Sequence, residues 1–351
     1  MINNRTVAIL GGLMLVLLLG CVGTAPTFEP ITPHAVAADA QPVVIDTDMA
    51  ADDWLAILYL LGRSDMDVKA IVVTGTGEAH CSAGTRNALD LVALAGRPDI
   101  PVACGREVPL EGNHAFPTDW RERVDDLLGL TLPENSRAVS GESAVEMLTR
   151  IIQGSPRRVH LIALGPLTNV GEALEAEPAL VTNLEMITVM GGAVEVAGNV
   201  GSSSSIENEV AEWNIYVDPR AAAEVFWSGA PITLVPLDAT NHVPLTMDFY
   251  RRLERDRTTS VAEFVYGVLA AQEENVRSGW YYFWDPLAAA IATEDGLGTF
   301  QEMSLVVVEE EGTESGRTLE SERGFVIRVA MTADRERFET LFLDAVNGRL
   351  P

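Results

Sequence analysis

The sequence predicts an α/β fold: one domain with a mainly parallel central sheet, flanking helices and an antiparallel strand pair near the C-terminus. Short apolar runs rich in β-branched residues alternate with helical stretches between residues 43 and 236, a pattern typical of parallel sheets. Two later strand-like runs, 304–308 and 324–331, flank a polar segment and predict the antiparallel pair. The stretch 41–351 is long enough for one large domain.

The first strand and the first helix of this domain follow each other closely. Residues 43–45 form an apolar run after Pro42, which predicts a short buried strand, and residues 54–61 are apolar all round, which predicts a buried helix. Later apolar runs predict strands over 68–73, 101–103, 159–164, 186–190 and 232–236. The stretches between them predict helices over 85–95, 142–152, 168–174 and 219–227.

The N-terminal 40 residues are predicted to lie outside the domain. Residues 7–19 form an apolar run of 13 residues, which is too short to span a bilayer comfortably. The run ends in Leu-Leu-Gly before Cys21 and resembles a bacterial lipobox, which predicts a signal peptide over 1–21 and a lipid on the Cys21 thiol. An ordinary secretory signal with a chance cysteine is the alternative. Residues 22–40 predict a flexible tether, so we expect an extracytoplasmic protein, lipid-anchored to a bacterial membrane.

Composition narrows the range of partners. A formal net charge of −27 argues against nucleic acid and anionic membrane surfaces, because both would repel the protein; membrane contact is expected only through the lipid anchor. Besides Cys21, only Cys81 and Cys104 are present, too few for a disulfide framework and without metal-site spacing. In an extracytoplasmic protein these two cysteines either pair or remain as buried thiols.

Four aspartates stand where the first strand ends and the first helix begins: Asp46, Asp48, Asp52 and Asp53. The carboxyl end of a parallel strand is the usual ligand crevice of an open α/β sheet. Four carboxylates so close repel one another, and a hard divalent cation with oxygen ligands is the simplest partner that neutralises them. The alternative is that one or two of these acids only cap the helix.

Residues 46–53, DTDMAADD, resemble the DxDxxxDD signature of the nucleoside hydrolases, the inosine-uridine-preferring family of N-ribohydrolases. LGPLTN at 164–169, MGGA at 190–193, AEWNIYVDP at 211–219 and WDPLAAA at 284–290 are similar to further motifs of that family, in the same order. The resemblance covers about residues 43–293. It implies a single nucleoside-hydrolase-like domain with a Rossmann-like sheet, and an enzyme that hydrolyses ribonucleosides to free base and ribose. Family members are usually dimers or tetramers, so a homo-oligomer is expected.

The resemblance also assigns roles to residues. It implies a Ca²⁺ site made by the side chains of Asp48, Asp53 and Asp285 and by the backbone carbonyl of Leu164. It implies substrate contacts from Met190, Asn199, Glu212, Trp213 and Asn214. Glu212 and Asn214, two apart in a segment predicted to be extended, are expected to point the same way. Asp52 remains as the general base, because a carboxylate beside a metal-bound water can take its proton.

The chain departs from the family pattern after its second strand. Family members commonly carry Asn in a Gly-Gly-Asn turn, and counting back from Asn87 places Gly77 at that position. The next residue, Glu78, is expected to take over the hydroxyl contact.

A second departure concerns the leaving base. Trp284 stands where many base-tolerant members have His, and the purine-preferring branch likewise has Trp there, activating the base by stacking. We therefore predict a purine preference. Trp120, Tyr281 and Tyr282 are candidates for the other side of the stack, with core or rim positions as the alternative. Further candidate leaving-group acids are His114 and His242.

Two other functions remain open from the residues alone. A phosphatase of the haloacid dehalogenase type also begins with a strand and DxD, but Ala50 stands where Thr or Val is wanted, and Lys69 is the only lysine available for a later motif. A lipid-anchored protein that binds nucleosides or sugars on a degenerate hydrolase fold is the non-enzyme alternative. The departure at Gly77 supports it, whereas the complete set of aspartates argues against it.

Overall fold

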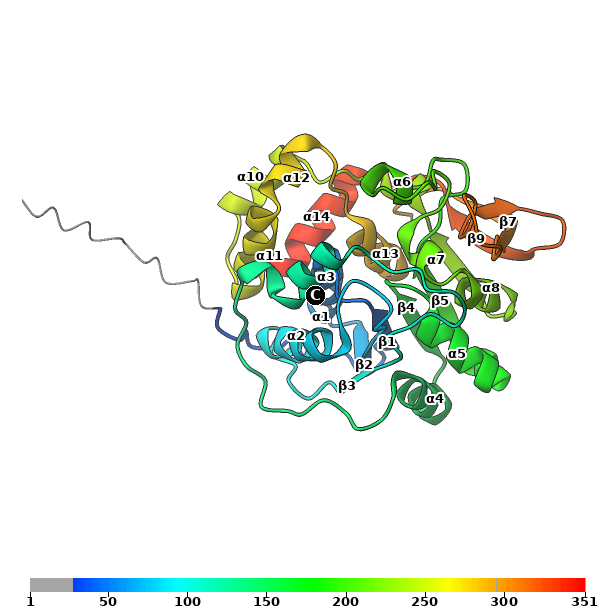
Figure 1. Ribbon diagram of the computed structural model, residues 1–351. Coiled ribbons are helices and arrows are strands. Elements are labelled where there is room, and N and C mark those ends of the chain that lie inside the picture. Colours follow the sequence, from blue (N-terminus) through cyan, green and yellow to red (C-terminus); the bar gives the residue numbers. More distant parts are fainter. Residues whose placement is uncertain (1–27, 295, 351) are drawn as a thin grey trace, which may run out of the picture.

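Within the computed structural model, which describes residues 28–294 and 296–350, nine strands form one sheet in the order β3-β2-β1-β4-β5-β6-β9-β7-β8 (Figure 1). Pairing is parallel from β3 to β9 and antiparallel between β9, β7 and β8. The bounds are β1 Gln41–Thr47, β2 Met66–Val73, β3 Val102–Cys104, β4 Val159–Ala163, β5 Leu184–Met190, β6 Ile232–Val235, β7 Phe300–Val307, β8 Thr318–Glu320 and β9 Phe325–Ala330. The predicted mainly parallel sheet with an antiparallel C-terminal pair is confirmed; the short edge strand β8 was not predicted.

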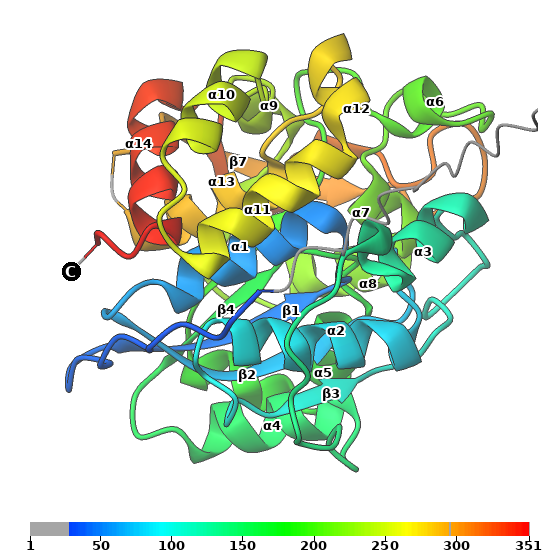
Figure 2. The same ribbon diagram turned by 90° about the vertical axis from the view of Figure 1, so that its left-hand side faces the viewer.

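Helices cover both faces of the sheet (Figure 2). The helices that pack on one face are α1 Ala51–Leu61, α2 Cys81–Leu94, α10 Met247–Arg255, α11 Ser260–Ala271, α13 Trp284–Thr293 and α14 Arg335–Val346. The opposite face carries α4 Ala144–Gly154, α5 Thr168–Ala176 and α8 Pro219–Trp227. Shorter helices are α3 Thr118–Asp125, η1 Leu127–Gly129, η2 Pro178–Asn183, α6 Val200–Ser203, α7 Trp213–Val217, α9 Leu237–Thr240 and α12 Glu273–Ser278.

Strand β1 lies at the point where the order of the sheet reverses. It pairs with β2 on one side and with β4 on the other. Its side chains alternate, so that Val43 and Ile45 enter the core beneath α1 and Val44 enters the core on the other face. Every residue of α1 is buried, and its stretch 54–61 is apolar all round, as expected of a buried helix. The carboxyl end of β1 is therefore a switch point, where ligands of open α/β sheets bind.

Two local predictions from the sequence are wrong. The segment with Glu212 and Asn214 is not extended: helix α7 begins at Trp213, and the Glu212 side chain caps it by accepting from the backbone N–H groups of Asn214 and Ile215. The sequence around Glu212 does not distinguish an acid that caps a helix from an acid in an extended segment, which is why the prediction was wrong. Part of the predicted tether is also packed on the domain. The Phe28 side chain is buried against Phe264, with ring centroids 5.4 Å apart.

The predicted signal peptide over 1–21, Cys21 and residues 22–27 lie outside the described residues. Within 28–294 and 296–350, no helix combines the length and apolar character that crossing a membrane requires.

Candidate active site

The acidic stretch forms a tight turn between β1 and α1. Met49 has the left-handed backbone conformation, with φ 59°, which is costly for a residue with a side chain and points to a functional constraint. The turn is fastened by Trp54, whose indole N–H donates to the Met49 carbonyl over 2.8 Å. Ala50, not an aspartate, is the N-cap of α1 and makes no side-chain cap bond. Helix capping alone therefore does not explain the acids.

Two glycines let neighbouring loops approach the Asp48 side chain. A Cβ on Gly77 would lie 2.0 Å from the Cβ of Asp48, and one on Gly165 would lie 2.6 Å from it. The Asp48 carboxylate accepts from the backbone N–H groups of Ala50 at 3.3 Å and Glu78 at 3.1 Å. Gly77 thus serves close packing, and the side chain that this turn sends into the cavity wall is that of Glu78.

Three carboxylates form a cluster suited to a cation. Asp52, Asp53 and Asp285 each offer an oxygen within 4.8 Å of the others, and all three are buried. One oxygen of Asp53 and one of Asp285 are buried without a hydrogen-bond partner. Buried carboxylates without partners are costly, and an oxygen-loving cation satisfies them. The residues therefore fit a metal ion.

This cluster differs from the predicted ligand set in one member. It contains Asp52, whereas Asp48 lines the same cavity with its oxygens on backbone N–H groups. Leu164 also lines the cavity, and its carbonyl accepts from the Asn214 amide at 2.7 Å.

Burial and mutual repulsion make the charged forms of these carboxylates unfavourable in the absence of a positive charge. Burial, followed by the Asp48 carboxylate, raises the pKa of Asp52 to about 7. Burial and neighbouring aspartates also raise the pKa values of Asp53 and Asp285 well above the ordinary range. The pKa of Glu78 rises well above its ordinary value through burial in the cavity wall and repulsion by Asp48 and Asp52.

The cluster forms the floor of a cavity of about 370 Å³. All twelve residues predicted for the site line it: Asp48, Asp52, Asp53, Glu78, Leu164, Met190, Asn199, Glu212, Trp213, Asn214, Trp284 and Asp285. They come from the ends of β1, β4 and β5 and from α1, α7 and α13 together with the loops between elements. Sequence motifs that are up to 237 residues apart, counting from Asp48 to Asp285, thus meet in one place.

Polar side chains beside the floor are held rigidly. Glu212 accepts from the Gly192 N–H at 2.9 Å as well as capping α7, and burial raises its pKa to about 7. The Asn214 amide also donates to the Met190 carbonyl at 3.2 Å. Asn199 accepts from the Trp213 N–H at 3.1 Å. Fixed groups of this kind suit a ligand with several hydroxyls.

Aromatic rings form the upper wall, and their arrangement extends what the sequence suggested. Trp284 contacts Tyr281 with ring centroids 5.2 Å apart and Tyr282 at 5.8 Å. It contacts Trp280 at 6.0 Å, and Trp280 in turn contacts Trp120 at 6.4 Å. We call the rings that line the cavity the aromatic collar: Phe116, Trp120, Trp213, Trp280, Tyr281 and Trp284.

The two histidines considered as acids are not among the residues that line this cavity. His114 stacks on Tyr216 and hydrogen-bonds its carbonyl at 2.7 Å, and His242 is exposed on the surface. Cavity residues that sequence reasoning missed include Phe116, Arg123, Gln272, Asn275 and Trp280. The aromatic run that ends at Trp284 was a usable signal for Trp280. Arg123 and Gln272 belong to no pattern that the sequence displays.

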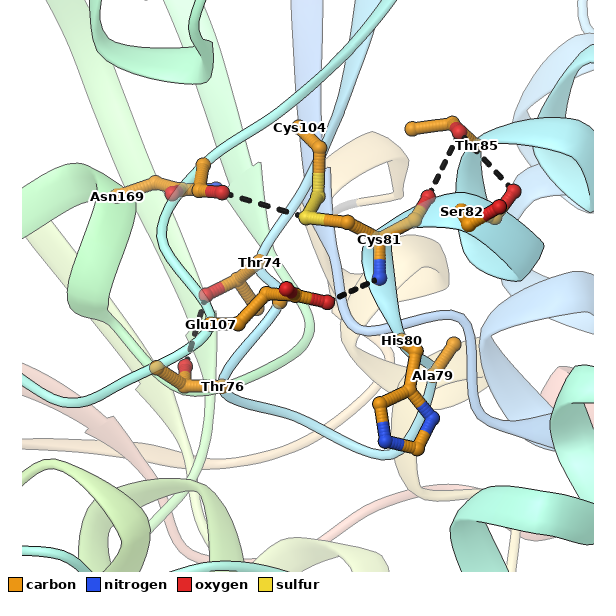
Figure 3. Close-up of a disulfide and its surroundings, with 12 residues drawn as sticks. Thr74, Thr76, Ala79, His80, Cys81, Ser82, Thr85, Cys104, Glu107 and Asn169 are labelled. Carbon is orange, nitrogen blue, oxygen red and sulfur yellow. Dashed lines mark hydrogen bonds between the residues drawn. A yellow bond between two sulfur atoms is a disulfide. The ribbon is translucent and has the colours of Figure 1, made fainter.

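Cys81 and Cys104 form a disulfide, which settles the alternative that their sequence left open (Figure 3). The bond joins the first residue of α2 to the last residue of β3. Just before Cys81 lies the turn that carries Glu78, and after Cys104 runs the segment that leads to Phe116. The Cys81 N–H also donates to a carboxylate oxygen of Glu107 at 3.0 Å. Two loops that contribute to the cavity wall are therefore tied together at their bases.

Comparison with known proteins finds nucleoside hydrolases by sequence and by structure. The family model described as inosine-uridine preferring nucleoside hydrolase matches residues 43–340. Uridine nucleosidase 1 of Arabidopsis thaliana is 33% identical over 282 residues, which are 80% of this chain and 81% of that protein. The pyrimidine-specific ribonucleoside hydrolase RihA of Klebsiella pneumoniae is 35% identical over 229 residues, 64% of this chain and 70% of that protein. The solved structure of a purine-preferring ribonucleoside hydrolase from Gardnerella vaginalis has a TM-score of 0.76 and 28% identity, covering 88% of this chain and 99% of that chain.

The chain is therefore an enzyme of the nucleoside hydrolase class. It belongs to the inosine-uridine preferring nucleoside hydrolase family, whose substrates are ribonucleosides and whose members depend on a metal ion. The resemblance stated from the motifs is confirmed, and the haloacid dehalogenase-type phosphatase is excluded. The degenerate binding protein is excluded as well, since Asp48, Asp52, Asp53 and Asp285 line one cavity in an enzyme family.

Proposed function

We propose that this enzyme hydrolyses the N-glycosidic bond of ribonucleosides, prefers purines, and uses Ca²⁺ with Asp52 as the general base. The observation that carries the proposal is the buried cluster of Asp52, Asp53 and Asp285, whose oxygens lie within 4.8 Å of one another. The residues that would hold the ion are Asp53 and Asp285 of this cluster together with Asp48 and the Leu164 carbonyl, while Asp52 stays free to act as the base; all supply oxygen atoms only, as Ca²⁺ prefers. When bound, the ion would polarise an attacking water and orient ribose hydroxyls.

In the proposed reaction, water attacks the anomeric carbon while the bond to the base nitrogen breaks. Asp52 accepts the proton that the water loses, and the base leaves with the bonding electron pair and gains a proton from solvent. Charge develops on the sugar in an oxocarbenium-like transition state, which nearby carboxylates stabilise. Glu212 and Asn214 lie beside the floor and would hold the ribose, together with Asn199, Met190 and Glu78.

Trp284 supports the purine preference. Its ring lines the cavity next to Tyr281, with ring centroids 5.2 Å apart, so a purine could lie against an aromatic face. A protonated base over an indole is stabilised by a cation–π interaction of about 0.5–2 kcal/mol. Purines gain more than uracil because they have a basic N7 and a larger face.

Uridine hydrolysis is the second candidate. The relatives from Arabidopsis thaliana and Klebsiella pneumoniae are named as a uridine nucleosidase and a pyrimidine-specific hydrolase. One experiment tests both: purified protein with and without Ca²⁺ is incubated with inosine, guanosine, adenosine, uridine and cytidine, and released reducing sugar is measured. Faster cleavage of purine nucleosides supports the proposal, whereas faster cleavage of uridine refutes the stacking argument. No release from any of them refutes nucleoside hydrolysis.

We further propose that the enzyme works outside the cytoplasm, anchored through a lipid on Cys21, as a dimer or tetramer. The Cys81–Cys104 disulfide supports the compartment, because disulfides persist in oxidising environments. Cys21→Ser should leave the protein unprocessed or in the soluble fraction. A soluble wild-type protein whose N-terminus is not Cys21 would contradict the anchor. Light scattering of the purified protein measures the number of subunits.

A further inference from the structure

One cation stands among the acids of the cavity. Of the described residues that line it, Arg123 is the only Arg, Lys or His, and it lies on α3, as does the collar residue Trp120. Six acidic side chains line the same cavity: Asp48, Asp52, Asp53, Glu78, Glu212 and Asp285. A single positive group in such surroundings attracts an electron-rich atom of a ligand.

Arg123 is held at the mouth, not at the floor. Its guanidinium donates to the Gln272 side-chain oxygen at 3.1 Å, which links α3 to the end of α11. The same oxygen accepts from the Asn275 amide at 3.1 Å. Arg123 and the collar residue Trp280 are both exposed, whereas the aspartates of the floor are buried. We call Arg123, Gln272 and Asn275 the rim triad.

The acids lie at the floor of the cavity and the rim triad at its mouth, and these positions predict how a bound nucleoside is oriented. A ribose at the acidic floor places the glycosidic bond near Asp52 and the base inside the aromatic collar. The edge of the base that is remote from the sugar then faces the mouth, where the rim triad lies.

Resting on the ribonucleoside hydrolysis proposed above, we propose that Arg123, fixed by the rim triad, selects nucleosides whose base carries a carbonyl oxygen on this remote edge. The class comprises 6-oxopurine nucleosides such as inosine, and uridine among the pyrimidines. Adenosine and cytidine carry an amino group at the corresponding position and are disfavoured.

Hydrogen-bond chemistry gives the direction of this selection. A guanidinium has N–H donors and no acceptor. It can therefore donate to a carbonyl oxygen of the base, whereas an amino group of the base would place one donor against another. Because Gln272 offers its oxygen to both Arg123 and Asn275, its amide N–H₂ group is the part that can face a ligand. With the Gln272 oxygen occupied by these two donors, the Asn275 side-chain oxygen is the acceptor of the triad that can face a ligand. A charged donor forms the stronger bond, so the guanidinium outweighs that neutral acceptor.

Kinetics of an Arg123 variant separate this role from general effects. The quantity to measure is kcat/KM for inosine divided by kcat/KM for adenosine, because a change in the ratio cancels losses common to both substrates. Arg123→Met removes the donors with little change in length, and the ratio should fall about tenfold, the lower end for a hydrogen bond to a charged group since Arg123 is exposed. Arg123→Lys keeps a cationic donor and should retain most of the ratio. The uridine-to-cytidine ratio should change in the same direction.

Arg277→Met is the matched control. Arg277 is an exposed arginine on the neighbouring α12, pairs with Glu273 and does not line the cavity. The Arg277→Met substitution removes the same charge from the same region, so the inosine-to-adenosine ratio of kcat/KM in this variant should equal that of the wild type. An unchanged ratio in Arg123→Met, or an equal fall in Arg277→Met, overturns the selection by Arg123. A wild-type enzyme that cleaves no nucleoside overturns the proposed hydrolysis itself, which is a distinguishable outcome.

Discussion

Breaking the Cys81–Cys104 disulfide tests how strongly it supports the cavity wall. The perturbation is made in two ways: reduction of the wild-type protein, and the double variant C81A/C104A. Reduction leaves both sulfur atoms in place, so it isolates the covalent bond from side-chain packing. The bond (Figure 3) joins the end of the loop that carries Glu78 to the beginning of the segment that leads to Phe116, so both stability and catalysis report on it.

The size of the stability effect follows from the loop that the bond closes. The cysteines are 23 residues apart, and closing a loop of that length in the unfolded chain is worth about 3 kcal/mol in the chain-entropy model. Unfolding of a chain this long has an entropy of roughly 0.7 kcal/mol per kelvin, taking about 2.1 cal/mol/K for each residue. Loss of the disulfide should therefore lower Tm by about 4 °C.

Differential scanning calorimetry of oxidised and reduced protein measures this change, with free-thiol titration to confirm reduction. Reduction should also lower kcat/KM, because the turn with Glu78 loses its attachment to β3. Oxidised protein carried through the same steps without reductant is the control, because its disulfide stays intact. A Tm change below about 1 °C on complete reduction would show that the hydrogen bonds of the turn hold it without the disulfide.

Three further predictions concern the carboxylates and Trp284. Asp52→Asn should lower kcat by about 10²–10⁴-fold while calorimetry shows Ca²⁺ affinity only modestly weakened, and an active variant would place the base elsewhere. In metal-free protein, the raised pKa values of Asp53 and Asp285 mean that these groups lose their protons at lower pH in the unfolded chain than in the folded protein. Thermal stability should therefore fall as pH rises above about 4, and added Ca²⁺ should restore it mainly at the higher pH. A stability that rises over this range without metal would contradict that sign. Trp284→Ala should reduce kcat more on inosine than on p-nitrophenyl riboside, whose leaving group needs no protonation; equal losses would mean that Trp284 only shapes the cavity.

The floor of the site was predictable because its residues follow a local rule. Asp48, Asp52 and Asp53 stand between a β-branched run and an apolar helix, and the end of a parallel strand is where ligands bind. Asp285 was found only through its motif, since its approach to Asp53 depends on how α13 packs beside α1. Local pattern fixes the elements, and packing of distant helices fixes which carboxylates meet.

The mouth of the site was not predictable in the same way. Arg123 lies in a short exposed helix of mostly charged residues, where an arginine is ordinarily solvated, and its partner Gln272 is 149 residues away. Glu212 misled for a different reason: alternation of polar and apolar residues indicates a strand, yet its carboxylate satisfies the N–H groups of a helix start. The Glu212 side chain makes two hydrogen bonds at this helix start, to the N–H groups of Asn214 and Ile215, and no periodicity of the sequence encodes them.

The clustering of carboxylates at the floor lowers the stability of the metal-free protein but provides the oxygens that a metal ion needs. Asp53 and Asp285 have buried oxygens without partners, and the chain brings them together with a left-handed Met49 and with Gly77 packed against Asp48. The unpartnered buried oxygens and the left-handed backbone of Met49 each cost folding free energy, whereas Gly77 avoids the clash that a side chain at its position would make with Asp48. A bound cation reverses the balance, because it satisfies the unpartnered oxygens only when the turn has folded, and its binding energy is then added to the stability of the domain. The unpartnered oxygens that destabilise the metal-free protein are thus the atoms that a cation would bind.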